Sequence, residues 1–335
     1  MKKGLLLTSP LSLALLFLSF ACTGDSQTLT IYSGRSESLV GPLLNDFTKQ
    51  TGIKIRVRYG DTTELASTIL EEGKNSPADI FYAQDVASLD ALAKANRLTK
   101  LSNDILNLVS EPYRSPQGQW LGTSGRARVV AYNTAKINPD QLPASILEYT
   151  DPKWRGRVGW APTNASFQSF VTALRLLKGE DAARSWLLGM KANNPKEYPN
   201  NVTALQAVAN GEVDVAFVNH YYLFRALKEQ GSGFKARNYY FRDGDPGGLV
   251  FVSGAAILDT ADNRGEAEAF LKFLLSTQAQ KYFSDQTFEY PMIEGVPTNP
   301  ELPPLSQLEP PAIDLSQLTD LQGTLKLLRE TGILP

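Results

Sequence analysis

Apolar and polar positions follow two different periods along the chain, and the two periods alternate from about residue 28 onward. Period-two alternation and short apolar runs predict strands at 28–32, 53–58, 78–82, 127–132, 157–160, 213–218 and 247–258. Apolar residues spaced three and four apart predict helices between Ser36 and Gly52 and at 62–72, 86–95, 167–177, 202–210, 222–227, 266–275 and 278–284.

Strands that alternate with helices predict an α/β fold, with mostly parallel sheets flanked by helices. One such set fills the first part of the chain, a second begins near Arg126, and the late strand at 247–258 returns to the first. We therefore predict two lobes with a cleft and a hinge between them. The first comprises 28–126 plus about 247–300, and the second comprises 127–246 plus about 301–335. The hinge is expected at 126–130 and at 243–248, where Gly244, Gly247 and Gly248 permit backbone change.

The N-terminus has the features of an export signal. Lys2 and Lys3 precede a broken apolar stretch that ends in Ser-Phe-Ala, so we predict a signal peptide over 1–21 and a tether over 22–27. Cys22 is the only cysteine, which excludes an internal disulfide. Residues 18–22 resemble a bacterial lipoprotein box, in which Cys22 is acylated. The alternative to acylation is ordinary cleavage of the signal peptide, after which Cys22 is an incidental cysteine.

Charge and motif content narrow the classes of function. The net charge is −2, both signs are mixed, and no basic block is present, so nothing favours nucleic acid. No Ser-His-Asp set, HExxH motif or glycine-rich phosphate loop occurs. The single histidine, His220, leaves little for acid–base catalysis, so an enzyme is the weaker alternative.

Two adjacent tyrosines, Tyr221 and Tyr222, stand where the strand at 213–218 gives way to a helix. This junction is a usual place for sites in α/β proteins. Phenolates are hard oxygen donors, and a pair of them suits a hard trivalent cation such as Fe³⁺. The ordinary interpretation is that one tyrosine packs in the core while the other hydrogen-bonds at the surface.

Six short segments, taken in order, are similar to those of a known family. They are 29–35, 77–82, 124–132, 153–160, 219–222 and 245–249. On these segments the chain resembles the periplasmic ferric-iron-binding proteins of bacterial ABC transporters, which have the two-lobe type II periplasmic binding fold. The resemblance covers essentially the whole mature chain. It implies that Tyr221 and Tyr222 are iron ligands and that an ABC permease is the partner.

The chain departs from the family at the other ligands that some members carry. Ser36 stands where a histidine is found, Gln84 where a glutamate is found, and the loop 164–166 lacks a tyrosine. Fe³⁺ prefers about six oxygen donors, so we expect Tyr32 as a third phenolate and carbonate or phosphate as a synergistic anion. The residues expected to bind the anion include the start of the helix near 167, whose N–H groups attract anions. They are Arg35, Arg126, Asn164, Ala165, Ser166, Asn201 and Asn219.

His220 remains open as a ligand, as a partner of a phenolate, or as a solvent-facing residue. The main alternative function is a carrier of polyamine, sulfate or phosphonate on the same fold. The expected protein is a monomer in the periplasm, or on the outer face of the membrane if Cys22 carries lipid.

Overall fold

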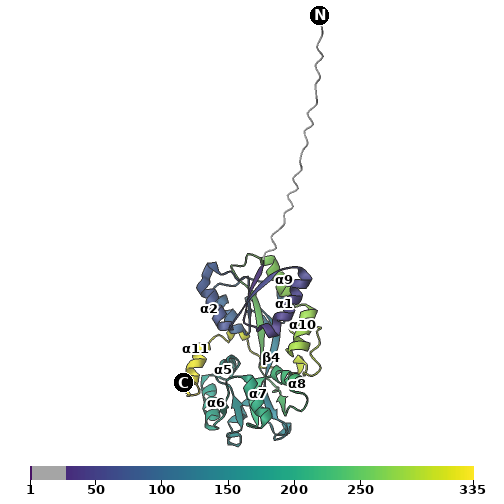
Figure 1. Cartoon of the computed structure of the whole chain (residues 1–335). Helices are drawn as coiled ribbons and strands as arrows, with labels where there is room; N and C mark the ends of the chain where they lie inside the picture. Colours follow the sequence, from purple (N-terminus) through teal and green to yellow (C-terminus); the bar gives the residue numbers. More distant parts are fainter. Residues whose placement is uncertain (2–27) are drawn as a thin grey trace.

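The fold centres on a mixed β-sheet with helices packed around it (Figure 1). The computed structural model describes Met1 and residues 28–335. The predicted export signal, tether and acylated Cys22 fall on residues 2–27 and so lie outside the described residues. In the described part of the chain, no helix is both long enough and apolar enough to cross a bilayer.

Nine strands form the sheet. They are β1 (Leu29–Ser33), β2 (Ile55–Tyr59), β3 (Ile80–Ala83), β4 (Leu121–Asn133), β5 (Val158–Trp160), β6 (Lys196–Glu197), β7 (Val215–Asn219), β8 (Ala236–Tyr239) and β9 (Val250–Ile257). Their order is β2-β1-β3-β9-β4-β7-β5-β6, and β8 also pairs with β4. The pairs at both ends of this order are parallel, whereas every pair that includes β4 or β9 is antiparallel.

The helices cover the sheet with their apolar faces. They are α1 (Glu37–Thr51), α2 (Thr62–Glu72), α3 (Val86–Lys94), α4 (Asn103–Leu106), α5 (Ala165–Lys178), α6 (Glu180–Ala192), α7 (Asn201–Asn210), α8 (Tyr221–Gln230), α9 (Arg264–Leu274), α10 (Thr277–Tyr282) and α11 (Leu321–Glu330). In α1, for example, Val40, Leu43, Leu44 and Phe47 are buried, and Gly52 ends the helix in the left-handed conformation.

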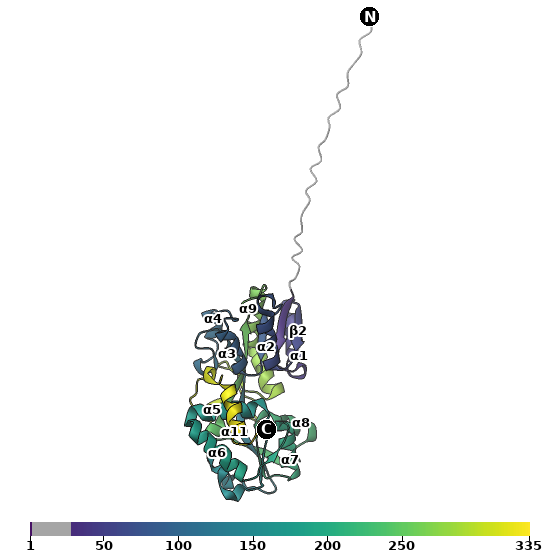
Figure 2. The ribbon, with the colours of Figure 1, turned by 90° about the vertical axis from the view of Figure 1, so that its left-hand side faces the viewer.

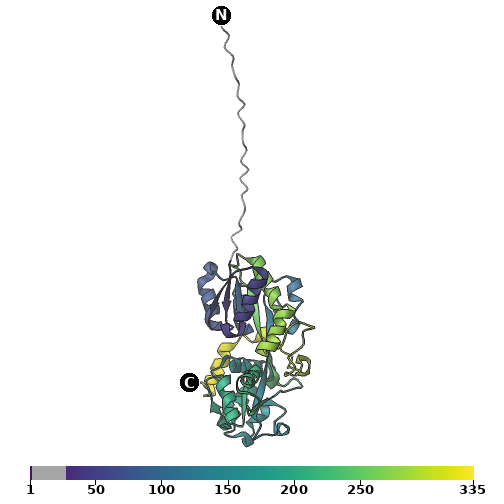
Figure 3. The same ribbon diagram turned by 45° about the vertical axis from the view of Figure 1, so that its right-hand side comes forward.

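The molecule consists of two lobes (Figures 1 and 3). The first part of β4, Leu121–Ala127, pairs with β9, and the next part, Arg128–Tyr132, pairs with β7. The first lobe contains β1, β2 and β3 with α1, α2 and α3, and the second contains β5, β6 and β7 with α5 to α8. The strand β4 therefore crosses from one lobe to the other without a break.

The C-terminal segment contacts both lobes. The short helical turn Leu315–Gln317 packs against α3 of the first lobe, and α11 packs against α5 of the second (Figure 2). Arg175 of α5 pairs with Asp320 at 2.8 Å, just before α11. The predicted assignment of 301–335 to the second lobe therefore fits α11, whereas the preceding turn lies on the first lobe. The exact lobe boundaries stay a prediction.

The glycines of the expected hinge serve different purposes. Gly244 has φ +69°, a conformation that favours glycine. Gly247 has no such φ, and a Cβ atom there would lie 2.5 Å from ring atoms of Phe241. Gly247 thus permits close packing rather than an unusual backbone conformation, and its role in hinge motion stays a prediction.

Candidate functional site

The tyrosine pair lies where the predicted strand-to-helix junction occurs. β7 ends at Asn219, and α8 begins at Tyr221. The rings of Tyr221 and Tyr222 are tilted by 32°, with centroids 4.2 Å apart, so the two side chains lie together. Tyr221 is 3% exposed. Burial and the neighbouring Tyr222 raise the pKa of Tyr221, and the charge of Arg126 opposes this rise.

Tyr222 lines a small pocket between the lobes, which we call the cleft pocket. The cleft pocket has a volume of about 120 Å³ and is lined from both lobes and from the crossing strands β4 and β9. Its lining residues are Gln84, Asp85, Arg126, Asn164, Ala165, Ser166, Ser169, Asn201, Asn219, Tyr222 and Phe251. The sequence analysis named ten candidate ligands and anion-binding residues. Seven of them line the cleft pocket, and the other three, Tyr32, Arg35 and Tyr221, do not.

The amide and hydroxyl side chains of the pocket form one hydrogen-bonded network. Asn164 is the N-cap of α5, and its Oδ1 accepts from Ser166 N at 3.1 Å and from Ser166 Oγ at 2.6 Å. Asn201, at the start of α7, donates from Nδ2 to Asn164 Oδ1 at 3.2 Å and to Ser166 Oγ at 3.1 Å. Two helix N-termini therefore meet at the pocket, an arrangement that favours negatively charged ligands.

Two arginines of β4 add positive charge. Arg126 donates to the carbonyl oxygen of Gln84. Arg128 donates from Nη1 to Asn219 Oδ1 at 3.1 Å and to Ser166 Oγ at 3.3 Å. Both arginines are buried, and neither forms a salt bridge with any carboxylate of the described residues. Burial lowers the pKa of Arg128 to about 10, and Tyr222 opposes this shift. The sequence analysis missed Arg128, although its two-residue spacing from Arg126 places both on one face of the strand.

Carboxylates are scarce near the pocket. Asp85 lines it, and burial raises the pKa of Asp85 against the opposing charge of Arg126. Across the described residues, no three His, Cys, Asp or Glu side chains come together as a metal-binding group. Such a group does not account for a metal ion here, whereas the phenol oxygens of Tyr221 and Tyr222 are hard donors of the type that Fe³⁺ prefers.

Neither Tyr32 nor Arg35 lines the cleft pocket. The Tyr32 hydroxyl donates to Glu72 Oε1 at 2.8 Å, at the end of α2. Arg35 is fully buried and donates to Gln84 Oε1 at 2.7 Å and to Glu289 Oε2 at 2.6 Å. The expectation for Tyr32 needs correction, because its hydroxyl is bonded to Glu72 away from the pocket. Arg35 lies beside the pocket through its bond to Gln84, and its role in anion binding stays a prediction.

His220 is fully buried, and both of its ring nitrogens have partners. Nδ1 accepts from the Ala127 N–H at 3.1 Å, and Nε2 lies 2.7 Å from the carbonyl oxygen of Phe288. This pattern assigns the proton to Nε2 and leaves no lone pair for a metal. Of the three roles left open, those of ligand and solvent-facing residue do not fit this environment.

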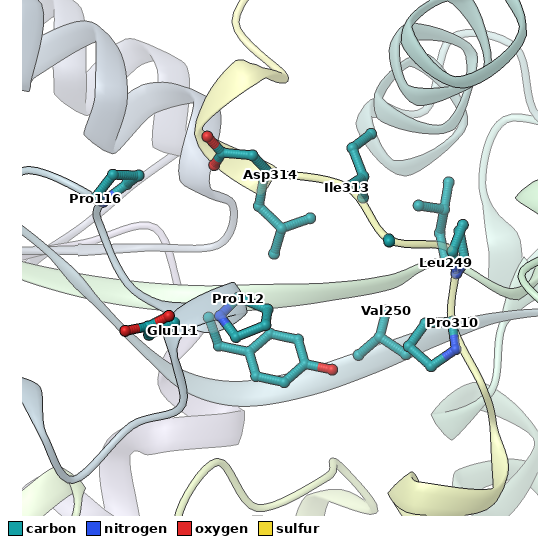
Figure 4. A pocket seen from close by; sticks show the side chains of 12 residues that line it. Glu111, Pro112, Pro116, Leu249, Val250, Pro310, Ile313 and Asp314 are labelled. Carbon is teal, nitrogen blue, oxygen red and sulfur yellow. The ribbon is translucent and has the colours of Figure 1, made fainter.

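A larger cavity lies beside the start of β9. It has a volume of about 470 Å³ and is lined mainly by prolines and aliphatic side chains, among them Pro112, Val250 and Pro310 (Figure 4). The carboxylates of Glu111 and Asp314 lie at its edge. Apart from these, few polar groups converge there, so the cleft pocket remains the candidate site.

Comparison with known proteins gives the family. A family model described as bacterial extracellular solute-binding protein matches residues 75–314. The major ferric iron-binding protein of Neisseria meningitidis serogroup B is 37% identical, covering 93% of this chain and 95% of the relative. The Fe(3+)-binding periplasmic protein of Serratia marcescens is 36% identical, covering 96% and 95%. The crystal structure of iron-bound HitA from Pseudomonas aeruginosa superposes with a TM-score of 0.86 at 41% identity, covering 91% of this chain and 99% of that chain. The chain therefore belongs to the family of bacterial extracellular solute-binding proteins.

Proposed function

We propose that this protein is the extracytoplasmic solute-binding component of a bacterial ABC iron-uptake system. In this proposal, Fe³⁺ binds in the cleft to the phenolates of Tyr221 and Tyr222. The observation that carries the proposal is the contact between the two tyrosine rings at the wall of the cleft pocket. Relatives named for ferric iron binding support the same cargo, and membership of a solute-binding family favours binding over catalysis.

An anion completes the coordination. Two phenolates leave about four of the roughly six positions around Fe³⁺ open. Ser166 lines the pocket and accepts hydrogen bonds from both Arg128 and Asn201. Carbonate or phosphate bound at this corner would accept charge-assisted hydrogen bonds from such donors. The pocket lining also includes Arg126, Asn164, Ala165 and Asn219. We therefore expect iron binding to depend on bicarbonate or phosphate, with weak binding in buffer depleted of both.

The alternative cargoes fit the pocket less well. Pockets for organic molecules usually have volumes of about 300–1,000 Å³, whereas the cleft pocket has about 120 Å³. Two buried arginines also oppose a polyamine cation. Sulfate or phosphonate fits the anion donors but makes no use of the buried tyrosine pair. Binding of either anion at full strength without iron, and without effect on iron binding, would favour that alternative.

The visible spectrum of the purified protein tests the proposal. Fe³⁺–phenolate complexes absorb visible light, so addition of ferric citrate should produce a band in the wild type. The variants Tyr221→Phe and Tyr222→Phe keep the ring and lose the donor oxygen, and each should weaken or abolish the band. Tyr32→Phe is the matched control, because the Tyr32 hydroxyl is bonded to Glu72. Normal iron binding by the Tyr221→Phe/Tyr222→Phe double variant would refute the site.

We also propose that the protein delivers iron to a permease while anchored by lipid on Cys22. Bound iron favours closed lobes only through contacts that the open form lacks. Small-angle X-ray scattering should therefore give a smaller radius of gyration with iron than without. Replacement of Cys22 by serine should release the monomeric protein from the membrane fraction without affecting iron binding.

A further inference from the structure

Glu289 is a buried carboxylate with one oxygen free. It is 1% exposed and follows the π-helical turn Phe283–Thr287. Its Oε2 accepts from Arg35 Nη2 at 2.6 Å and from Thr287 Oγ1 at 2.9 Å. Its Oε1 is buried and has no hydrogen-bond partner among the described residues. A buried carboxylate oxygen without a donor is unfavourable, so this atom calls for a cation or a donor from outside the chain.

Arg35 holds Glu289 next to the cleft pocket. One Nη of Arg35 bonds Gln84, which lines the pocket, and the other Nη bonds Glu289. The guanidinium is planar and rigid. The Glu289 carboxylate is therefore fixed beside Gln84, near the first-lobe wall of the pocket.

The preceding residue joins Glu289 to the helix that carries the tyrosines. The carbonyl oxygen of Phe288 lies 2.7 Å from His220 Nε2, and its ring stacks on Phe224 of α8 with centroids 5.4 Å apart. Phe288 has φ +56°, a conformation that is costly for a phenylalanine and is often found at functional sites. Glu289 thus lies between Arg35 of the first lobe and the start of α8.

We propose that Glu289 supplies a third protein oxygen to the ferric ion, through its free Oε1. This inference rests on the function proposed above. Arg35 holds Oε2 and so fixes the orientation of the carboxylate, as hydrogen-bonded partners of metal-binding carboxylates do. Two phenolates and one carboxylate together balance the three charges of Fe³⁺, and all three are hard oxygen donors.

A set of charge-matched variants tests this role against simple pairing with Arg35. Glu289→Gln leaves Arg35 buried without its partner, which itself threatens folding. The double variant Arg35→Gln/Glu289→Gln removes both charges and places two amides where they can hydrogen-bond. Circular dichroism and thermal melts establish that the double variant is folded. Glu72→Gln is the control, because Glu72 also accepts from a tyrosine hydroxyl but lies at the end of α2.

Iron affinity and the visible band are measured by titration with ferric citrate. We expect the folded double variant to bind iron about 10- to 100-fold more weakly. Loss of a carboxylate donor leaves the iron more electron-poor, so the phenolate band should move to longer wavelength. Wild-type affinity with an unchanged band in the double variant would show that Glu289 serves only Arg35. A wild-type protein without any iron band would instead refute the proposed function, whatever the variants do.

Discussion

Replacement of Arg128 by methionine should weaken anion binding and destabilise the iron-free protein by no more than about 3 kcal/mol. Arg128 is 3% exposed and forms no salt bridge within the described residues, and burial lowers its pKa from the ordinary 12.5 to about 10. A shift of this size corresponds to a desolvation cost of about 3 kcal/mol, since one pKa unit is about 1.4 kcal/mol. The charged form, and hence the cost, is present at neutral pH.

Methionine removes this cost together with the hydrogen bonds to Ser166 and Asn219. Each bond from a charged donor contributes about 1.5–3 kcal/mol, so the two together contribute about 3–6 kcal/mol. Relief of the desolvation cost leaves a net loss of at most about 3 kcal/mol in the iron-free protein. A bound phosphate loses one such bond. We expect its affinity to fall roughly 10- to 150-fold, because 1.4 kcal/mol is a factor of ten.

The two effects are measured separately. Isothermal titration of phosphate into the iron-loaded protein gives the anion affinity, and urea unfolding of the iron-free protein gives its stability. Arg97→Met is the matched control. Arg97 is also buried, but it pairs with Asp259 at 2.8 Å. This control should lose roughly 1–3 kcal/mol of stability and keep full anion affinity. Unchanged phosphate affinity in Arg128→Met, or a loss of stability above about 3 kcal/mol, would refute the reasoning.

Three further predictions concern pH and packing. Burial raises the pKa of Asp85, so its charged form destabilises the fold once the pH exceeds the unfolded value near 3.9; Asp85→Asn should raise the melting temperature at pH 7 but not at pH 3. Burial lowers the pKa of His220 to about 3, so the unfolded chain binds more protons between about pH 3 and 6.5. Stability should therefore fall on acidification across this window, and urea melts of His220→Gln should show a flatter dependence. Gly247→Ala places a Cβ atom 2.5 Å from the Phe241 ring and should cost about 1–3 kcal/mol in thermal unfolding; an unchanged melting temperature would contradict the packing role.

The spacing of apolar residues predicted the helices with a regular pattern, whereas two helices that contain a glycine were missed. The helix expected at 62–72 matches α2, but α6 and α11 were not predicted. Each contains a glycine, which weakens a helical pattern. A Cβ on Gly189 would lie 2.9 Å from Thr150, and one on Gly323 would lie 2.6 Å from Nη2 of Arg175. Close tertiary approach therefore decides these positions, and sequence periodicity does not reveal it.

The candidate site was predictable where it depends on local order along the chain. Three asparagines of the site lie at or next to the start of a helix: Asn164, Asn201 and Asn219. The fold class brings such helix starts together, so their convergence could be predicted. The partner of Tyr32 is 40 residues away, and Glu289 is bonded to a residue 254 positions earlier. These contacts depend on three-dimensional packing, and no local pattern marks them.

The uninterrupted course of β4 has a consequence for cooperativity. Its two halves complete the sheets of different lobes, and β9, which pairs with it, comes from a part of the chain more than a hundred residues later. The sheet of the second lobe lies within 128–239, whereas the first lobe needs β9 to pair both β3 and the first half of β4. The first lobe therefore cannot form its full set of backbone hydrogen bonds from one contiguous fragment. A chain cut after β8 would leave an unpaired edge on β3 and on the first half of β4. The two lobes should accordingly fold and unfold as one unit, even though a chain of this size usually divides into separately folding domains.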